Sequence, residues 1–271
     1  MKLSGNNKVS SPKKASLPIN YEFLNYLKTY IEEYSAHSSH TPSIYYSPSS
    51  LNCIRQMYYK RTGTNVDIIE DNYSSIGMAD TGTRRHEAIQ DVLVYMTSKH
   101  SRFLYIDVDR FISERQKRGK CLTLQVRGKC GAETAVFDTK RNVSFRVDGI
   151  IYDTKNKQFY LFEFKNQISF KASKKSEVDQ AHKNQVHCYC ALLELDKALV
   201  VYENRDNCEL YCPEVLEITD YEKLSILNLL DKCESFVNEH KLPPVPEDVS
   251  NITCNYCNYK STCRQDLKGG V

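Results

Sequence analysis

Two short stretches of sequence decide the fold: Arg146-Val147-Asp148-Gly149-Ile150-Ile151 and Phe162-Glu163-Phe164-Lys165. Both are rich in the β-branched and aromatic residues that favour strands. The polar segment 153–157 between them is typical of a turn, so we expect a β-hairpin that places Asp148 beside Glu163. Because side chains alternate between the faces of a strand, Glu163 and Lys165 should face a cleft while the two phenylalanines face a core.

The predicted hairpin brings two carboxylates together with the amine of Lys165. Carboxylate oxygens are ligands that Mg2+ and Mn2+ prefer, and a lysine beside them can orient or help deprotonate an attacking water. These residues therefore predict the site of a metal-dependent phosphodiesterase. The same pattern also fits an ordinary surface salt bridge on a solvated sheet. Motifs elsewhere in the chain have to decide between the two interpretations.

Four of the 11 cysteines have a spacing typical of a metal site. Cys254, Cys257 and Cys263 lie together near the end of the chain, and Cys53 lies far upstream. No apolar leader precedes residue 20 and no apolar run has membrane-spanning length, so we expect a cytoplasmic protein with no membrane partner, where clustered thiols hold a metal. Four thiolates suit tetrahedral zinc or an iron–sulfur cluster. A zinc ribbon typically has two Cys-x-x-Cys pairs and this chain has one, which favours a cluster.

The other seven cysteines show no spacing that indicates a metal site. Free cysteine is among the most buried residue types, so we expect these to be small buried hydrophobes. They are Cys121, Cys130, Cys188, Cys190, Cys208, Cys212 and Cys233.

Six motifs follow one another along the chain in a recognisable order. They are Cys53, Gly82-x-x-x-His86, Asp148, Glu163-x-Lys165, Gln185-x-x-x-Tyr189 and the cysteine triplet from Cys254 to Cys263. In this order, over residues 45–266, the chain resembles the RecB-type branch of the PD-(D/E)xK nucleases, most closely the CRISPR-associated (Cas-four-like) exonucleases and their phage-borne relatives. Two departures are the basic segment 113–129 and Val147, where the family name suggests a proline.

The resemblance implies an α/β fold with a restriction-endonuclease-like core, a central mixed sheet flanked by helices. It also implies an iron–sulfur cap built from the N- and C-terminal segments, in which Cys53, Cys254, Cys257 and Cys263 hold a 4Fe-4S cluster. The metal ligands for Mg2+ or Mn2+ would be His86, Asp148, Glu163 and the backbone carbonyl of Phe164. Lys165 would position the nucleophile, and Gln185 with Tyr189 would support the site and contact the DNA strand.

The local sequence around three of these residues also has plainer interpretations. His86 lies near the start of a predicted amphipathic helix, where a lone histidine is usually a polar surface residue. Gln185 and Tyr189 share one helix face, which fits a core tyrosine with an exposed glutamine. Only the resemblance assigns these three residues to a site.

Composition limits how the chain can bind nucleic acid. The net charge of the 271 residues is +3, so attraction for DNA must be local. Candidate basic patches are Arg84-Arg85, residues 110–129 and residues 171–175, each of which also fits a solvated surface. The 19 tyrosines and 10 phenylalanines could stack on unpaired bases. No Walker A loop is present, so any helicase must be another chain. The expected partners are DNA and a separate helicase, recombinase or integrase subunit.

We expect four regions along the chain: a disordered basic tail at 1–18, an N-terminal helical region at 19–101, the nuclease core at 102–218, and a C-terminal helix with the cysteine module at 219–271. Helices are predicted at 20–36, from Ser47-Pro48 to near Gly63 with Cys53 one turn in, at 177–195 and at 220–239. Strands are predicted at 102–109, 121–128, 134–139, 144–152, 158–165, 198–204 and 208–218.

The predicted function is a metal-dependent DNA exonuclease that acts on single strands or ends, with endonuclease activity left open. Its pathway would be recombination, repair or CRISPR adaptation. The alternative is a catalytically silent, cluster-bearing DNA-binding or scaffold subunit. An intact set of Asp148, Glu163 and Lys165 argues against that alternative, because a silent relative has no need of all three.

Overall fold

The computed structural model describes residues 19–36, 43–67, 73–99, 101–120, 122–130, 133–168, 176–247, 254–255 and 257–268. The predicted tail at 1–18 and the basic stretch 171–175 lie outside these ranges. The chain divides into two compact units, residues 1–40 with 70–79 and residues 41–69 with 80–271. The first unit contains α1 (Ile19–Ala36), whose Phe23 and Tyr30 are exposed, and the beginning of α3 (Tyr73–Lys99).

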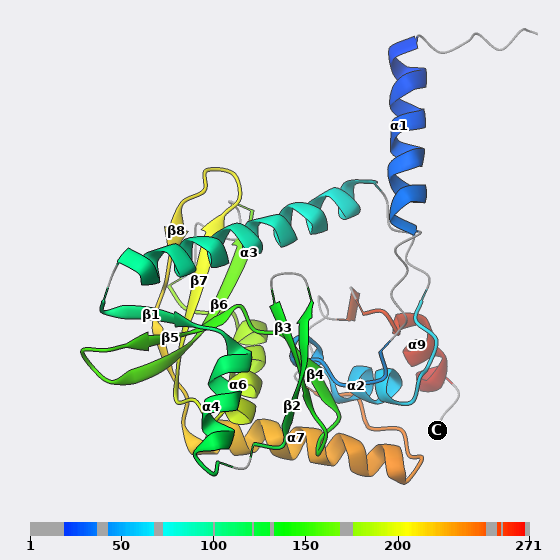
Figure 1. Cartoon of the computed structure of the whole chain (residues 1–271). Coiled ribbons are helices and arrows are strands. Elements are labelled where there is room, and N and C mark those ends of the chain that lie inside the picture. The colour runs from blue at the N-terminus through cyan, green and yellow to red at the C-terminus, as the bar shows by residue number, and fades with distance from the viewer. Residues whose placement is uncertain are drawn as a thin grey trace, which may run out of the picture. The chain divides into compact units, whose positions relative to one another are not determined.

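The second unit is built on a six-stranded sheet with the strand order β1-β5-β6-β7-β8, in which β9 also pairs with β7 (Figure 1). All pairings are antiparallel except that between β6 and β7, so the predicted central mixed sheet is confirmed. The strands are β1 (Phe103–Ile106), β5 (Gly149–Asp153), β6 (Gln158–Gln167), β7 (Lys197–Asn204), β8 (Leu210–Tyr211) and β9 (Val215–Glu217).

The predicted hairpin is formed by β5 and β6, with Gly149 opposite Phe162. Lys157 has a left-handed φ of 53° in the turn between them. The parallel strand β7 follows β6 through a crossover that contains α6 (Gln180–Leu193), as a parallel pair requires. The register of the hairpin therefore sets Asp148, the residue before β5, next to Glu163 on β6.

Helices cover both faces of the large sheet, which explains why β6 alternates two kinds of side chain (Figure 1). On one face, Ile89 and Leu93 of α3 pack on Phe162 and Phe164. On the other face lies the larger core, to which β6 contributes Leu161. Its other elements are α2 (Ile54–Arg61), α4 (Val108–Lys117), α6, α7 (Asp220–Asn238) and the small sheet of β2 (Leu124–Cys130), β3 (Glu133–Asp138) and β4 (Val143–Phe145).

The structure corrects several predicted element boundaries. The strand predicted at 102–109 ends at Ile106, and α4 begins two residues later because Val108, Phe111 and Ile112 bury one helical face. The run 144–152 is broken into β4 and β5, and the run 208–218 contains the two short strands β8 and β9.

Two predicted helices also differ from the structure. The helix expected from Ser47 is a 3-10 turn, η1 (Pro48–Ser50), followed by α2, with Cys53 as the residue that precedes α2. His86 lies in the middle of α3 rather than near its start. By contrast, α7 begins where predicted, because Thr219 and Glu222 form a capping box.

The expectation that all seven remaining cysteines are buried is wrong for two of them. Cys208 and Cys212 are exposed because they flank the short edge strand β8, whereas Cys188, Cys190 and Cys233 are buried. Cys121 lies outside the described residues. Within the described ranges, no helix is long and apolar enough to cross a membrane.

Candidate active site

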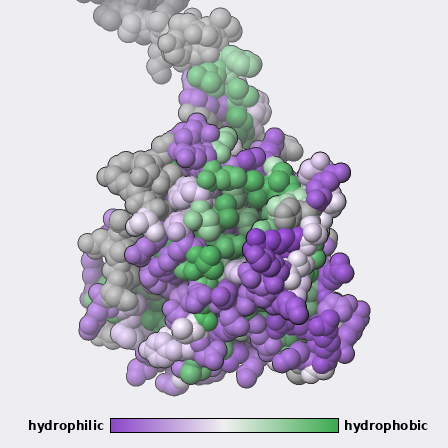
Figure 2. All heavy atoms as spheres, turned by 90° about the vertical axis from the view of Figure 1, so that its left-hand side faces the viewer, coloured by the Kyte–Doolittle hydropathy of each residue, from purple (hydrophilic) through white to green (hydrophobic). Residues whose placement is uncertain are grey.

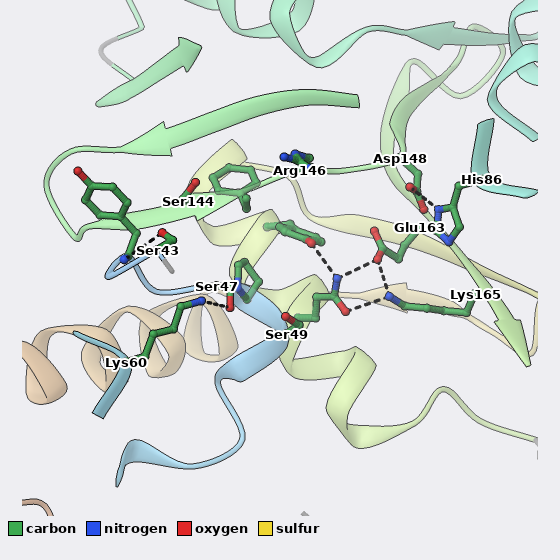
Figure 3. Close-up of a pocket in the computed structure, with 15 residues that line it drawn as sticks. Ser43, Ser47, Ser49, Lys60, His86, Ser144, Arg146, Asp148, Glu163 and Lys165 are labelled. Carbon is green, nitrogen blue, oxygen red and sulfur yellow. Dashed lines mark hydrogen bonds and ion pairs between the residues drawn. The ribbon is translucent and has the colours of Figure 1, made fainter. Parts of the chain in front are cut away.

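An open cavity of about 430 Å³ lies where β5 and β6 meet α3 and α6 (Figure 3). Six of the predicted site residues line it: His86, Asp148, Glu163, Lys165, Gln185 and Tyr189. Figure 3 shows His86, Asp148, Glu163 and Lys165 together at one end, and Lys60 with Ser47 at the other. The tertiary structure therefore gathers residues that lie about 100 positions apart in the sequence.

Asp148 is held in place by bonds to both its carboxylate and its backbone. The carboxylate accepts a hydrogen bond from the backbone N–H of Phe164 at 2.6 Å and lies 2.8 Å from Nδ1 of His86. Its backbone carbonyl accepts two further bonds, from Gln90 Nε2 and from the Tyr105 hydroxyl, both at 3.1 Å. The strand break at this position leaves the backbone carbonyl of Asp148 free for these two side-chain donors, because a residue inside the ladder would pair that carbonyl with the neighbouring strand.

Glu163 is 4% exposed and forms the centre of a second set of bonds. Its Oε1 accepts hydrogen bonds from Lys165 Nζ at 2.7 Å and from Gln185 Nε2 at 2.9 Å. Lys165 also donates to Gln185 Oε1 at 3.0 Å, and the Gln185 amide donates to the Tyr189 hydroxyl at 2.7 Å. Gln185 and Tyr189 are both buried, so the interpretation of an exposed glutamine beside a core tyrosine is wrong for the glutamine.

Asp148 and Glu163 are two buried carboxylates that repel each other when both are ionised and no cation lies beside them. Burial raises the pKa of Glu163 from 4.5 to about 7; Lys165 opposes this shift and Asp148 adds to it. A divalent cation beside the pair would offset the repulsion and favour the ionised carboxylates. The oxygen and imidazole donors of Asp148, Glu163 and His86 therefore fit a hard metal ion.

The described residues do not form a finished coordination shell. Within these ranges, no group of three or more His, Cys, Asp or Glu side chains is already arranged around a common metal position. The ring of Phe164 packs edge-on against His86 with centroids 5.1 Å apart, and its amide is bonded to Asp148. The predicted role of its carbonyl as a ligand stays a prediction.

The far end of the cavity carries positive charge that sequence reasoning did not find. Lys60 of α2 donates from Nζ to Ser47 Oγ at 2.9 Å, and burial lowers the pKa of its amine. Lys60 has no ion-pair partner within the described part of the chain. Arg146 and Ser49 line the same cavity. No local pattern marks Lys60 as a site residue, because α2 is brought here by packing.

The helix that carries His86 is anchored by an ion pair between half-buried Arg85 and buried Glu203. Glu203 of β7 is 1% exposed, and it accepts from Nε of Arg85 at 2.8 Å and from Asn166 Nδ2 at 2.8 Å. Arg84 pairs with Asp80 at 2.9 Å. Of the Arg84-Arg85 patch that the sequence suggested for DNA, Arg85 is bound to a buried carboxylate, whereas the Arg84 side chain is 77% exposed and its role stays a prediction. The Arg85 contact fixes α3 against β6 and β7, which points the adjacent His86 towards Asp148.

Cys53, Cys254, Cys257 and Cys263 line one cavity of about 160 Å³, together with Arg55 and Arg264. Burial raises the pKa of the Cys53 thiol, and the proximity of Cys263 and Cys254 adds to this shift. Thiolates that share a small space next to cations suit a bound metal or cluster.

The C-terminal segment is held by polar contacts to α2 and to the residues that follow α2. Tyr59 donates to Asp266 at 2.6 Å, and Ser261 donates to Asp67 at 2.9 Å. These contacts join residues about 200 positions apart in the sequence. They bring the two ends of the cysteine motif together without a disulfide.

No known protein-family model matches the chain, and no curated protein matches it. Among the 22 solved chains that are similar to it are the following two. The protein SSO0001 is 19% identical with a TM-score of 0.45, over 92% of this chain and 97% of that one. An alkaline exonuclease, LHK-Exo from Laribacter hongkongensis, is 12% identical with a TM-score of 0.45, over 73% of this chain and 90% of that one. Similarities this distant assign neither a family nor an activity, so the functional inference depends on the geometry of the site.

Proposed function

We propose that this protein is a Mg2+- or Mn2+-dependent deoxyribonuclease of the RecB-type PD-(D/E)xK kind. One observation carries the proposal: two buried carboxylates, Asp148 and Glu163, meet His86 and Lys165 in an open cavity whose other end holds the half-buried cation Lys60. A carboxylate pair at one end and a cation at the other suit a nucleic-acid substrate. The carboxylates would bind the metal that acts on the phosphodiester, and the cation would neutralise an adjoining phosphate.

Each residue of the site would have a separate role in the hydrolysis of a phosphodiester. A divalent cation, when bound by His86, Asp148 and Glu163, would supply a water of lowered pKa and neutralise charge on the phosphate. Lys165 would orient the attacking water, and the hydrogen bonds from its amine to Glu163 and Gln185 support this role. Lys60 would hold a neighbouring phosphate. Phosphoryl transfer depends largely on positioning and charge neutralisation, so no covalent intermediate is needed.

The finer parts of the proposal follow from the resemblance. The substrate would be single-stranded DNA or DNA ends, and the reaction would be exonucleolytic. The four cysteines that share a cavity would hold a 4Fe-4S cluster. A helicase, recombinase or integrase subunit would act with the protein in CRISPR adaptation, viral recombination or repair.

The proposed function is tested with purified protein, labelled single-stranded DNA, duplex DNA and RNA. We expect cleavage of DNA with Mg2+ or Mn2+ and none with a chelator. The same cations at about 100 times their Kd should raise the free energy of unfolding by about 2.7 kcal/mol. Binding of DNA without cleavage under either metal would favour the silent scaffold instead. Absence of any DNA binding would contradict both functions.

The glycine after Asp148 offers a sharper test of how that carboxylate is held. A Cβ at Gly149 would lie 2.2 Å from Cε2 of Tyr105, so Gly149→Ala must displace the ring whose hydroxyl supports the Asp148 carbonyl. Loss of an outer support of a metal ligand typically costs about 10–100-fold in activity or metal affinity. We expect kcat to fall by that factor in Gly149→Ala.

Tyr105→Phe, which removes only the hydroxyl, should give a smaller loss than Gly149→Ala. The matched control is Gly82→Ala, because nothing lies within 4 Å of a Cβ at Gly82. Separate measurements of kcat, KM and metal Kd check the expectation. Wild-type values in Gly149→Ala would show that Tyr105 does not position Asp148.

A further inference from the structure

A second cavity, of about 570 Å³, lies beside α4 and β1 at the edge of the large sheet. Its volume is typical of a ligand pocket, roughly 300–1,000 Å³. Apolar side chains form its floor, and cations surround it. The floor includes Leu104, Ile106, Phe111 and Phe159, and the cations are Arg110, Arg115, Arg118 and Lys120, with Glu114 as the acidic member.

The picture of this side agrees with that mixed character. Because β1 and α4 lie towards the left of Figure 1, Figure 2 looks onto their side of the molecule. Figure 2 shows that this side of the molecule carries a cluster of exposed hydrophobic residues with hydrophilic residues around it. A ligand on this surface can therefore meet apolar and polar groups at once.

The C-terminal end of α4 fixes the backbone from Arg115 to Lys120. Gly119, with a left-handed φ of 74°, donates to Gln116 O at 3.0 Å, and Lys120 donates to Arg115 O at 3.0 Å. This pair of bonds is a Schellman motif, which reverses the chain at the end of α4. The reversal holds the backbone of Lys120 against the carbonyl of Arg115 at the end of α4.

Most of the positive charge around this cavity is not neutralised by the protein. Arg115 pairs with Glu194 at 3.1 Å and lies over the Phe111 ring at 4.4 Å, so its charge is already neutralised within the protein. Glu114 pairs with Lys117 at 3.2 Å. The exposed side chains of the other three cations find no ion-pair partner among the residues that the structure describes. These three are Arg110, Arg118 and Lys120.

The cavity adjoins the catalytic residues through one side chain. Tyr105 lines it and also donates its hydroxyl to the Asp148 carbonyl at 3.1 Å. Along β6, Phe159 precedes Glu163 by four residues, a span of about 13 Å at roughly 3.3 Å per residue. Leu161, which lies between them on the same face of β6, is fully buried, so a DNA strand that occupied both cavities would have to pass over the surface of the protein.

On the basis of the proposed nuclease function, we propose that this cavity is a second subsite for the DNA strand, which holds one unpaired nucleotide away from the bond to be cut. Its base would lie on the apolar floor next to Phe159, and its phosphates would contact Arg110, Arg118 and Lys120. An aromatic floor combined with surplus positive charge suits a nucleotide, because bases stack on aromatic rings while lysine and arginine neutralise the backbone.

The test measures binding of oligodeoxythymidines of about 4 and about 20 nucleotides to the full chain by fluorescence anisotropy, over a range of salt and without divalent metal. Each phosphate contact on a single strand contributes about 0.7 to the slope of log K against log salt. In the triple variant Arg110→Ala, Arg118→Ala, Lys120→Ala, the slope for the longer strand should therefore fall by about 2. The affinity ratio of long over short strand should fall with it.

The matched control is Lys140→Ala, Lys232→Ala, Lys241→Ala, which removes the same charge from exposed positions outside the cavity. We expect the control to keep the wild-type slope. The single variant Arg118→Ala, with an expected fall of about 0.7, serves as a second measurement if the triple variant folds poorly.

An unchanged slope in a folded triple variant would overturn the subsite, and would leave these cations as solvated surface charges. Equal losses for short and long strands would also overturn it, since a distant subsite is reached only by the longer strand. If the wild type binds and cuts DNA while either of these results holds, only the subsite fails. A wild type that binds no DNA would remove the proposed function as well.

Discussion

Asp148→Asn, Glu163→Gln and Lys165→Ala should each reduce DNA cleavage by about 1,000-fold, which corresponds to about 4 kcal/mol of transition-state stabilisation. The two amide variants remove the negative charge that would bind the metal and retain nearly the same shape. Lys165→Ala removes the amine that Glu163 and Gln185 hold at 2.7 and 3.0 Å. The measurement is the single-turnover rate on labelled single-stranded DNA with Mg2+ or Mn2+.

Thermal unfolding of each variant without metal shows whether a loss of cleavage results from a loss of folding or from a loss of catalysis. Because burial, and to a lesser degree Asp148, raise the pKa of Glu163 against the opposing effect of Lys165, replacing Glu163 with glutamine removes an unfavourable charge. We expect the metal-free Tm of Glu163→Gln to be at least that of the wild type, while its stabilisation by Mg2+ disappears.

Glu87→Gln is the matched control for the carboxylate variants, since Glu87 is the exposed neighbour of His86 and lies outside the cavity. It should cleave like the wild type. Wild-type cleavage by Asp148→Asn would refute the proposed mechanism, whereas a loss in Glu87→Gln as large as in Glu163→Gln would move the metal site along α3.

Protein purified without oxygen should be brown, absorb broadly near ~400 nm and contain about four iron atoms per chain, as expected for a cubane with four thiolate ligands. Zinc would give a colourless protein with about one metal per chain. Cys53→Ser should lose the colour and the iron, because Cys53 is the single ligand from outside the C-terminal segment. Through the cluster, Cys53 would link α2 to the segment that begins at Cys254.

Loss of this link should lower stability and cleavage together. A cost of about 3 kcal/mol would lower Tm by roughly 6–12 °C. Cys208→Ser is the matched control, because Cys208 is exposed and does not line the cysteine cavity. An iron-free Cys53→Ser protein with wild-type melting and cutting would show that the cluster does not stabilise the protein. Stoichiometric zinc in the wild type would replace the cluster assignment.

Local sequence was enough to predict the central hairpin and the faces of β6. Glu163 and Lys165 line the cavity while Phe162 and Phe164 pack under α3, because alternation along a strand is a property of the backbone alone. The helical spacing of Gln185 and Tyr189 likewise placed both on one face of α6. These are relations between residues a few positions apart, which propensity and periodicity specify directly.

Local patterns failed where two elements compete for the same residues. The segment after Ile106 is predicted to continue as a strand, yet it forms α4. The helix buries Val108, Phe111 and Ile112 on one face, which packs on the core. The strand predicted through Asp148 is interrupted there. The interruption depends on the bonds that Phe164, Gln90 and Tyr105 make to Asp148, and none of these is a sequence neighbour.

The sequence by itself determined which residues carry the chemistry of the candidate site, since a carboxylate, an amine or a thiol is the same group wherever the chain places it. Only the tertiary structure decided which of them meet. It sets Lys60 across the cavity from Asp148, pairs Arg85 with buried Glu203 and leaves Arg118 open beside a second cavity. The physical reason is that long-range contacts depend on how whole helices and sheets pack, and short-range sequence patterns carry no record of that packing.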